Sequence, residues 1–174
     1  IEAGAEAILI NASGCGSTVK EYGFHLQNDA QYAQKAQHVS ELAKDIVEIL
    51  IGETEGLKAL FAHAPSAATL AYHPPCSLQH GQKLGGKVEL LLSGLGYPVL
   101  LPKDSHLCCG SAGTYSFLQP ELSGRLLQNK VNNLEALQPK AVLSGNIGCI
   151  AHIGSGTHIP VMHWIEYLDQ QLIA

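Results

Sequence analysis

Four of the five cysteines in this 174-residue sequence stand in short motifs that favour a shared thiolate site. Cys76 lies in YHPPCSLQH, the adjacent pair Cys108–Cys109 in HLCCGSAGTYS, and Cys149 in SGNIGCIAH. Thiolate is the soft ligand that iron–sulfur clusters and zinc both select. Because an adjacent cysteine pair is awkward for two disulfides but acceptable for a metal centre, the pattern favours four ligands for one metal site.

The residue types alone leave several interpretations of these thiols open. Four thiolates could hold an iron–sulfur cluster that transfers electrons. They could instead hold zinc, or no metal, in a structural domain, because zinc has no redox chemistry. The pair Cys108–Cys109 could also act as a catalytic dithiol, although a vicinal disulfide closes a strained ring. Finally, free cysteines are often small buried hydrophobic residues.

Other possible donors flank the cysteines. Imidazole can bind zinc and some iron sites, or it can donate a hydrogen bond to a ligand. Both roles are open to the four histidines beside the motifs, which are His73, His80, His106 and His152. The other five are expected to be structural or exposed: His25, His38, His63, His158 and His163. Cys15, in ASGCGST, stands apart from the other cysteines; it could be a possible additional cofactor-binding residue or a plain loop residue.

An alternation of apolar stretches and helical patterns must position these residues. Strands are predicted at residues 5–10, 69–73, 97–101, 141–144 and 158–164, and helices at 29–50, 55–62, 84–95, 120–137 and 164–172. Such alternation is typical of an α/β fold with a mostly parallel sheet flanked by helices. Since loops at the carboxyl ends of parallel strands gather at one edge, cysteines from different loops can converge there.

One segment of the sequence is repeated. AEAILINASGCGSTV (5–19) resembles AVLSGNIGCIAHI (141–153), so Cys15 and Cys149 occupy equivalent places. We therefore predict the tail of a first repeat, with connecting helices, in residues 1–65 and a complete second repeat in residues 66–174. APSAA (64–68) reads as a linker between them. If the repeats face each other, Cys15 lies near Cys76. We expect the chain to be a fragment of a longer protein.

Composition and motifs argue against several functions. The net charge is −5 and no dense stripe of Lys and Arg appears, which gives nucleic-acid binding little support. No apolar run of about 18 residues predicts a transmembrane helix, and no signal peptide is visible. The dinucleotide fingerprint G-x-G-x-x-G and the hydrolase motif G-x-S-x-G are missing. We therefore assign no catalytic residue to this chain.

Several motifs together resemble the cysteine-rich CCG domain. That domain occurs in the iron–sulfur subunits of glycolate oxidase, lactate-utilisation enzymes, anaerobic glycerol-3-phosphate dehydrogenase and heterodisulfide reductase. HPPCSLQHGQKL, SHLCCGSAGTY, NIGCIAHI and PVMHWIEYLD carry the resemblance, which is greatest to the C-terminal part of the glycolate oxidase group. It implies a Rossmann-like CCG repeat. It also implies an iron–sulfur cluster of the 4Fe-4S type on Cys76, Cys108, Cys109 and Cys149.

The resemblance further implies partners and a place in a complex. FAD-containing subunits would oxidise glycolate, and electrons would pass through this subunit to a quinone or another membrane acceptor. Such a protein would be cytoplasmic and peripheral to the inner face of the cell membrane. The fragment alone would not be catalytic. The alternative is a zinc-binding or metal-free docking domain of such a complex, or of a related lactate-utilisation or heterodisulfide-reductase-like oxidoreductase.

The sequence departs from the family pattern at one ligand position. The family ends its motif set with C-x-x-C, whereas this chain has NIGC, with Asn146 in place of the first cysteine. The first repeat has Ala12 at the equivalent place. The sequence therefore predicts four thiolates instead of five. Asn146 could act as an oxygen ligand or could hydrogen-bond the loop.

Overall fold

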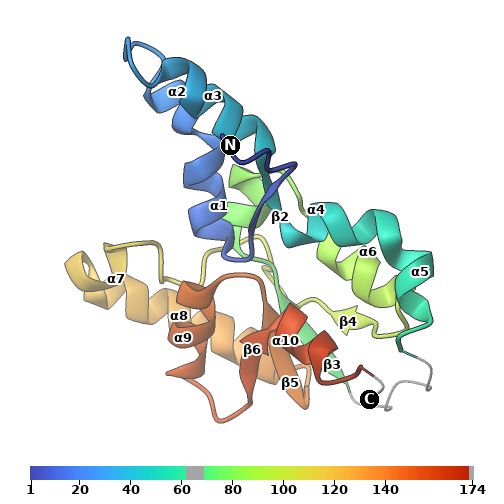
Figure 1. Cartoon of the computed structure of the whole chain (residues 1–174). Helices are drawn as coiled ribbons and strands as arrows, with labels where there is room; N and C mark the ends of the chain where they lie inside the picture. Colours follow the sequence, from blue (N-terminus) through green and yellow to red (C-terminus); the bar gives the residue numbers. More distant parts are fainter. Residues whose placement is uncertain (62–68, 173–174) are drawn as a thin grey trace.

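The computed structural model describes residues 1–61 and 69–172 (Figure 1). The short parallel pair joins β1 (Ile8–Ile10) to β2 (Ala43–Asp45). A four-stranded sheet has the order β4-β3-β5-β6, and its neighbouring strands are also parallel. Its strands are β3 (Leu70–His73), β4 (Val99–Leu100), β5 (Ala141–Ser144) and β6 (Val161–His163). The predicted α/β class with a mostly parallel sheet is confirmed.

Helices connect and cover these strands. In the first part of the chain they are α1 (Ser13–Lys20), α2 (Tyr22–His25), α3 (Ala33–Leu42), α4 (Ile46–Leu50), the 3₁₀ turn η1 (Ile51–Glu53) and α5 (Thr54–Lys58). In the second part they are the π-helical turn η2 (Ser77–Gly81), α6 (Lys87–Gly94), α7 (Tyr115–Leu118), α8 (Pro120–Glu135), α9 (Ile147–Gly154) and α10 (Trp164–Asp169). Figure 1 shows α2 and α3 projecting from the rest of the molecule as a pair.

The larger sheet buries both of its faces. Because side chains alternate along a strand, Leu70 and Tyr72 of β3 point to one face and Ala71 to the other. On the first face they pack with residues of α6 and α10, including Trp164. On the second face Ala71 packs with residues of α8 and α9, including Cys149 of α9. Cys109, from the loop between β4 and α7, belongs to the same cluster. The cysteine loops therefore belong to the α8–α9 side of the sheet.

One predicted element is wrong. The single helix expected at 29–50 is divided into α3 and α4 by β2, which pairs in parallel with β1. Asp45 ends this strand and caps α4: its carboxylate accepts from the Val47 N–H, while the Glu48 carboxylate accepts from the Asp45 N–H. Such a capping box marks a helix start, so the pattern Asp-x-x-Glu was the missed signal.

The remaining predicted strands and helices are present with shifted or shorter ends. Predicted strands 69–73 and 141–144 correspond to β3 and β5, while 97–101 is reduced to β4. The predicted linker 64–68, His63 and the end of predicted helix 55–62 lie outside the described residues.

The two halves of the chain share a local architecture. β1 and α1 are followed by β2 and α4, as β5 and α9 are followed by β6 and α10, and in both cases the two strands pair in parallel. His163 caps α10 with Glu166 as Asp45 caps α4 with Glu48. The boundaries 1–65 and 66–174 stay a prediction, and this correspondence supports them.

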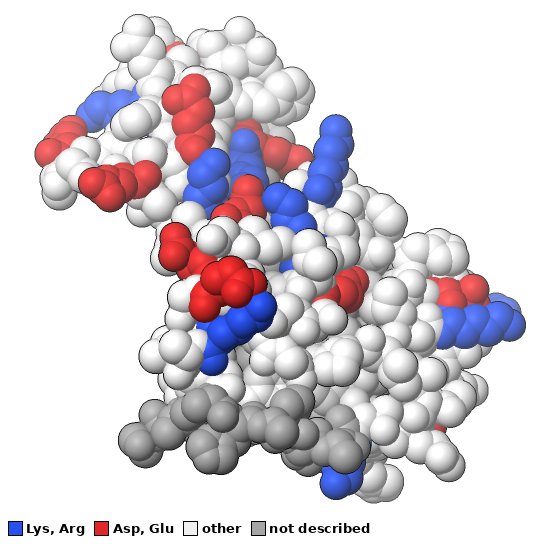
Figure 2. Space-filling model, turned by 90° about the vertical axis from the view of Figure 1, so that its right-hand side faces the viewer, with Lys and Arg blue, Asp and Glu red and all other residues white. Residues whose placement is uncertain are grey.

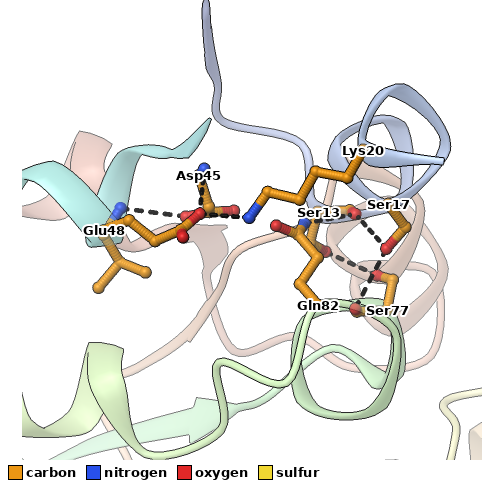
Figure 3. Close-up of polar contacts among 8 residues, drawn as sticks. Ser13, Ser17, Lys20, Asp45, Glu48, Ser77 and Gln82 are labelled. Carbon is orange, nitrogen blue, oxygen red and sulfur yellow. Dashed lines mark hydrogen bonds and ion pairs between the residues drawn. The ribbon is translucent and has the colours of Figure 1, made fainter. Parts of the chain in front are cut away.

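Polar contacts hold α1 against the turn that follows Cys76 (Figure 3). The hydroxyls of Ser13 and Ser77 lie 2.8 Å apart, and the Ser17 hydroxyl donates to the Ser77 carbonyl over 3.2 Å. Gln82 donates its side-chain N–H to the Ser13 carbonyl over 2.9 Å. These contacts fix the start of α1, and with it Cys15, beside the Cys76 loop.

On the face drawn in Figure 2, acidic and basic side chains are interspersed among uncharged ones. Within residues 1–61 and 69–172, no helix is long and apolar enough to cross a membrane.

Candidate metal centre

Cysteines from both parts of the chain surround one hollow. It has a volume of about 330 Å³ and is lined by Cys15, Cys76, Cys108 and Cys149, together with Asn146 and backbone-rich segments around Gly14 and Gly113. Cys109 is fully buried. Its Sγ lies within 4.8 Å of the Cys149 Sγ. The structure thus brings the four predicted thiols to one place and adds Cys15 to the wall.

The carboxyl ends of the strands position these thiols. Cys76 follows β3 by three residues and precedes η2, while Cys149 is the third residue of α9 after β5. The pair Cys108–Cys109 lies in the loop between β4 and α7. Because these strands are parallel, their loops meet at one edge, as the sequence pattern predicts.

Gly110 allows the sharp turn after the cysteine pair. Its φ is +100°, and a Cβ at this position would lie 2.6 Å from the Ser123 carbonyl oxygen. Only glycine fits such a conformation and such a close backbone. Its own N–H donates to the Cys108 Sγ over 3.3 Å, so the turn also presents a hydrogen-bond donor to the sulfur.

Hydrogen bonds among the sulfurs shift their pKa values in opposite directions. Those from Cys109 and Cys76 hold the pKa of Cys108 far below its usual value. A hydrogen bond from Cys109, helped by nearby His73, lowers the pKa of Cys149 to about 5. The hydrogen bond to Cys108 raises the pKa of Cys76 and of Cys109 well above the usual value. Since metal ions displace such protons, the group is suited to binding a cation.

His73 is the histidine that the structure brings into the thiol group. It is fully buried, and a ring nitrogen and the Sγ atoms of Cys109 and Cys149 all lie within 4.8 Å of one another. The ring is close enough to stabilise the Cys149 thiolate. Within the described residues, neither ring nitrogen has a partner at the distance and angle of a hydrogen bond.

The other three flanking histidines have different surroundings. His80 is exposed and donates to the carbonyl of His106, itself exposed, over 3.2 Å. His152 Nε2 lies 3.2 Å from the Ser123 hydroxyl, which itself donates to the Gly110 carbonyl. His152 therefore supports the glycine turn through Ser123. Among the remaining histidines, His163 is buried, caps α10 and donates to the Asn11 carbonyl over 2.7 Å.

Asn146 hydrogen-bonds the loop around it. Its side-chain oxygen accepts from the Gly14 N–H over 3.3 Å, and its N–H donates to the Cys149 Sγ over 3.5 Å. The residue stands at the N-cap position of α9, and Ala12 stands at that of α1. It links the two predicted repeats beside a thiolate.

Lys130 is a site residue that the sequence interpretation missed. Its side chain on α8 is buried, and it donates to the Asp104 carbonyl over 2.8 Å. Burial lowers its pKa, while the nearby Cys109, Asp104 and Cys108 favour its charged form. The missed signal is the helical spacing: Lys130 stands four residues before Leu134 and next to Val131, which places it on the buried face of α8.

The donors fit a metal centre by their chemistry. Soft sulfur atoms converge on one hollow, and the buried imidazole of His73 lies among them. Thiolate sets of this kind hold iron–sulfur clusters or zinc. Backbone N–H groups such as that of Gly110 supply the hydrogen bonds that tune a sulfur-ligated centre.

The parallel α/β fold gathers its cysteines at the strand ends. Residues 70–154 match the model of the CCG family, described as "Cysteine-rich domain". The predicted resemblance is confirmed.

Among known proteins, the chain is 52% identical over 172 residues to the glycolate oxidase iron–sulfur subunit of Escherichia coli, covering 99% of this chain and 41% of that one. It is 27% identical over 154 residues to a probable glycolate oxidase iron–sulfur subunit of Bacillus subtilis, covering 87% and 34%. It is also 27% identical over 182 residues to the lactate utilization protein A of Geobacillus thermodenitrificans, covering 97% and 72%. The chain thus spans well under half of the two glycolate oxidase subunits.

Proposed function

We propose that this chain is part of the iron–sulfur electron-transfer subunit of a glycolate-oxidising flavoenzyme complex. The observation that carries the proposal is the convergence of cysteines on one hollow, in a chain 52% identical to a named glycolate oxidase iron–sulfur subunit. The flavin that oxidises the substrate would be FAD on partner subunits, and the electrons would continue to a quinone or another membrane acceptor. We place the complex in the cytoplasm, against the inner face of the membrane.

Cys76, Cys108, Cys109 and Cys149 would hold a 4Fe-4S cluster. When bound, such a cluster supplies one-electron transfer. Cys15 and Asn146 stand at the same hollow, where Asn146 orients Cys149 and α1 covers the site. The chain's own contribution is to bury the ligands, to orient them from rigid strand ends and to offer N–H donors to sulfur. The choice between glycolate and lactate would lie in the flavin subunits.

A zinc-bound docking domain is the second candidate. It is favoured by the close grouping of His73, Cys109 and Cys149, whose donor atoms are near enough together to reach a single metal ion. Zinc would then hold the loops of the strand edge together without redox chemistry.

Metal analysis of anaerobically purified protein separates the two candidates. We expect brown protein with iron and acid-labile sulfide, and an EPR signal on reduction or oxidation. Cys149→Ser is expected to lose this iron, whereas Ser93→Ala, at an exposed position that does not line the hollow, is the control and should retain it. Colourless protein that takes up stoichiometric zinc, and no iron after anaerobic reconstitution, would contradict the electron-transfer proposal.

A further inference from the structure

We infer that His73 is itself a metal ligand, donating a ring nitrogen to the centre that Cys109 and Cys149 bind. This inference deepens the proposed function, on whose metal centre it rests. It assigns a mixed sulfur and nitrogen donor set to a site that the cysteine motifs alone describe as thiolate only. Because each iron of a 4Fe-4S cluster takes one protein ligand, His73 would stand in place of Cys76 or Cys108 in that ligand set.

The first observation is an imidazole buried without a polar partner. His73 has no exposed surface, and within residues 1–61 and 69–172 neither ring nitrogen has a partner at the distance and angle of a hydrogen bond. The ring nevertheless lies near enough to the Cys149 sulfur to lower the pKa of that thiol. Buried polar groups in proteins nearly always have a partner, because leaving one unpaired is unfavourable. A bound metal would supply that partner.

The second observation is the direction in which the ring lies. His73 ends β3 two residues after Ala71, so both side chains point to the sheet face that carries Cys109 and Cys149. The backbone there is fixed by pairing with Ser144 of β5, whose hydroxyl donates to the His73 carbonyl over 2.9 Å. The ring is thus presented by a rigid central strand.

The third observation is the distance among the donors. A ring nitrogen of His73 and the two Sγ atoms lie within 4.8 Å of one another, which allows all three to reach one metal ion. Other polar side chains at the site already have partners: His152 contacts Ser123, and Asn146 bonds Gly14 and Cys149. Within the described residues, the ring nitrogens of His73 have no hydrogen-bond partner of this kind and stay available to a metal.

Nitrogen hyperfine coupling tests this assignment directly. The chain is loaded anaerobically with iron and sulfide, and pulsed EPR is recorded with unlabelled and with ¹⁵N-histidine-labelled protein. We expect a strong nitrogen coupling that changes isotope pattern with the label. His73→Cys, which offers a thiolate in the same place, should retain iron and lose the coupling. His152→Asn, the matched control, should retain both.

Protein that contains iron and sulfide but shows no histidine coupling, or a coupling that survives in His73→Cys, would overturn the inference while leaving the proposed function intact. Wild-type protein that takes up no iron and sulfide would refute the proposed function instead. In that case the chain is loaded with Co²⁺, and a paramagnetically shifted, exchangeable imidazole N–H proton that His73→Cys lacks supports the ligand. Its absence from the wild-type spectrum refutes it.

Discussion

Asn146 and Gly14 are joined by a hydrogen bond although 132 positions separate them in the chain, with the Gly14 N–H donating to the Asn146 side-chain oxygen over 3.3 Å. The same amide donates to Cys149. One side chain therefore connects the start of α1 to the sulfur of Cys149 on α9.

Asn146→Ala is expected to lower the free energy of unfolding by about 1 kcal/mol, because it removes a hydrogen bond between distant segments. Urea denaturation of the metal-free protein measures this loss. Asn28→Ala, at an exposed position, is the control and should change little. Equal stability of the Asn146 and Asn28 variants would show that the link contributes nothing.

Lys130→Met should make the centre harder to reduce. A buried positive charge near Cys108 and Cys109 stabilises the more negative, reduced form, so its removal lowers the reduction potential. We expect a shift of about −30 to −60 mV, given that about 59 mV is a tenfold change for one electron. Potentiometric titration followed by EPR measures it. Lys140→Met, at an exposed position, should leave the potential unchanged. A Lys130→Met shift no larger than that of the control would rule out the charge effect.

Gly110→Ala should destabilise the protein by at least about 1–3 kcal/mol, because its φ of +100° and the carbonyl at 2.6 Å leave no room for a Cβ. Gly124→Ala, in the exposed part of α8 with no atom within 4 Å of an added Cβ, should stabilise it by up to about 1 kcal/mol. Thermal unfolding of both variants gives the comparison. Similar effects from both substitutions would contradict the proposed role of the turn.

Stability should fall on mild acidification through His163. Burial lowers its pKa, so the folded state binds its proton less readily than the unfolded state, whose histidine pKa is about 6.5. Stability therefore rises with pH up to about that value and is lost as pH falls below it. His163→Asn, which keeps a capping side chain, should flatten this part of the profile. Urea denaturation between pH 5 and pH 8 measures the slope, and an unchanged slope in the variant would exclude His163 as its source.

The sequence was most informative where local pattern and final contacts agree. Strands β3 and β5 are short apolar runs bounded by Pro74 and Gly145, and the structure places both at the centre of the sheet. The convergence of cysteines could be predicted because loops of parallel strands share an edge. The ligand role of each cysteine stays a prediction.

Features that depend on contacts between distant residues could not be predicted from the sequence. β2 is three residues long, and its Ala43 fits the helical spacing of its neighbours, so only its pairing with β1 shows that it is a strand. The isolation of His73 depends on what surrounds it in space, which its place in the sequence beside Cys76 does not specify. The role of Lys130 could not be predicted, because it depends on the packing of α8 that brings its side chain near Cys108 and Cys109.

The placement of α1 has a consequence for how the site is assembled. Gly14 and Cys15 form part of the wall, while the other thiols that line it follow β3 later in the chain, so a bound cofactor would touch both halves of the chain. Cofactor retention and repeat docking are then reciprocally linked: whatever loosens the serine contacts of Figure 3 weakens cofactor affinity, and cofactor loading tightens those contacts by the same free energy.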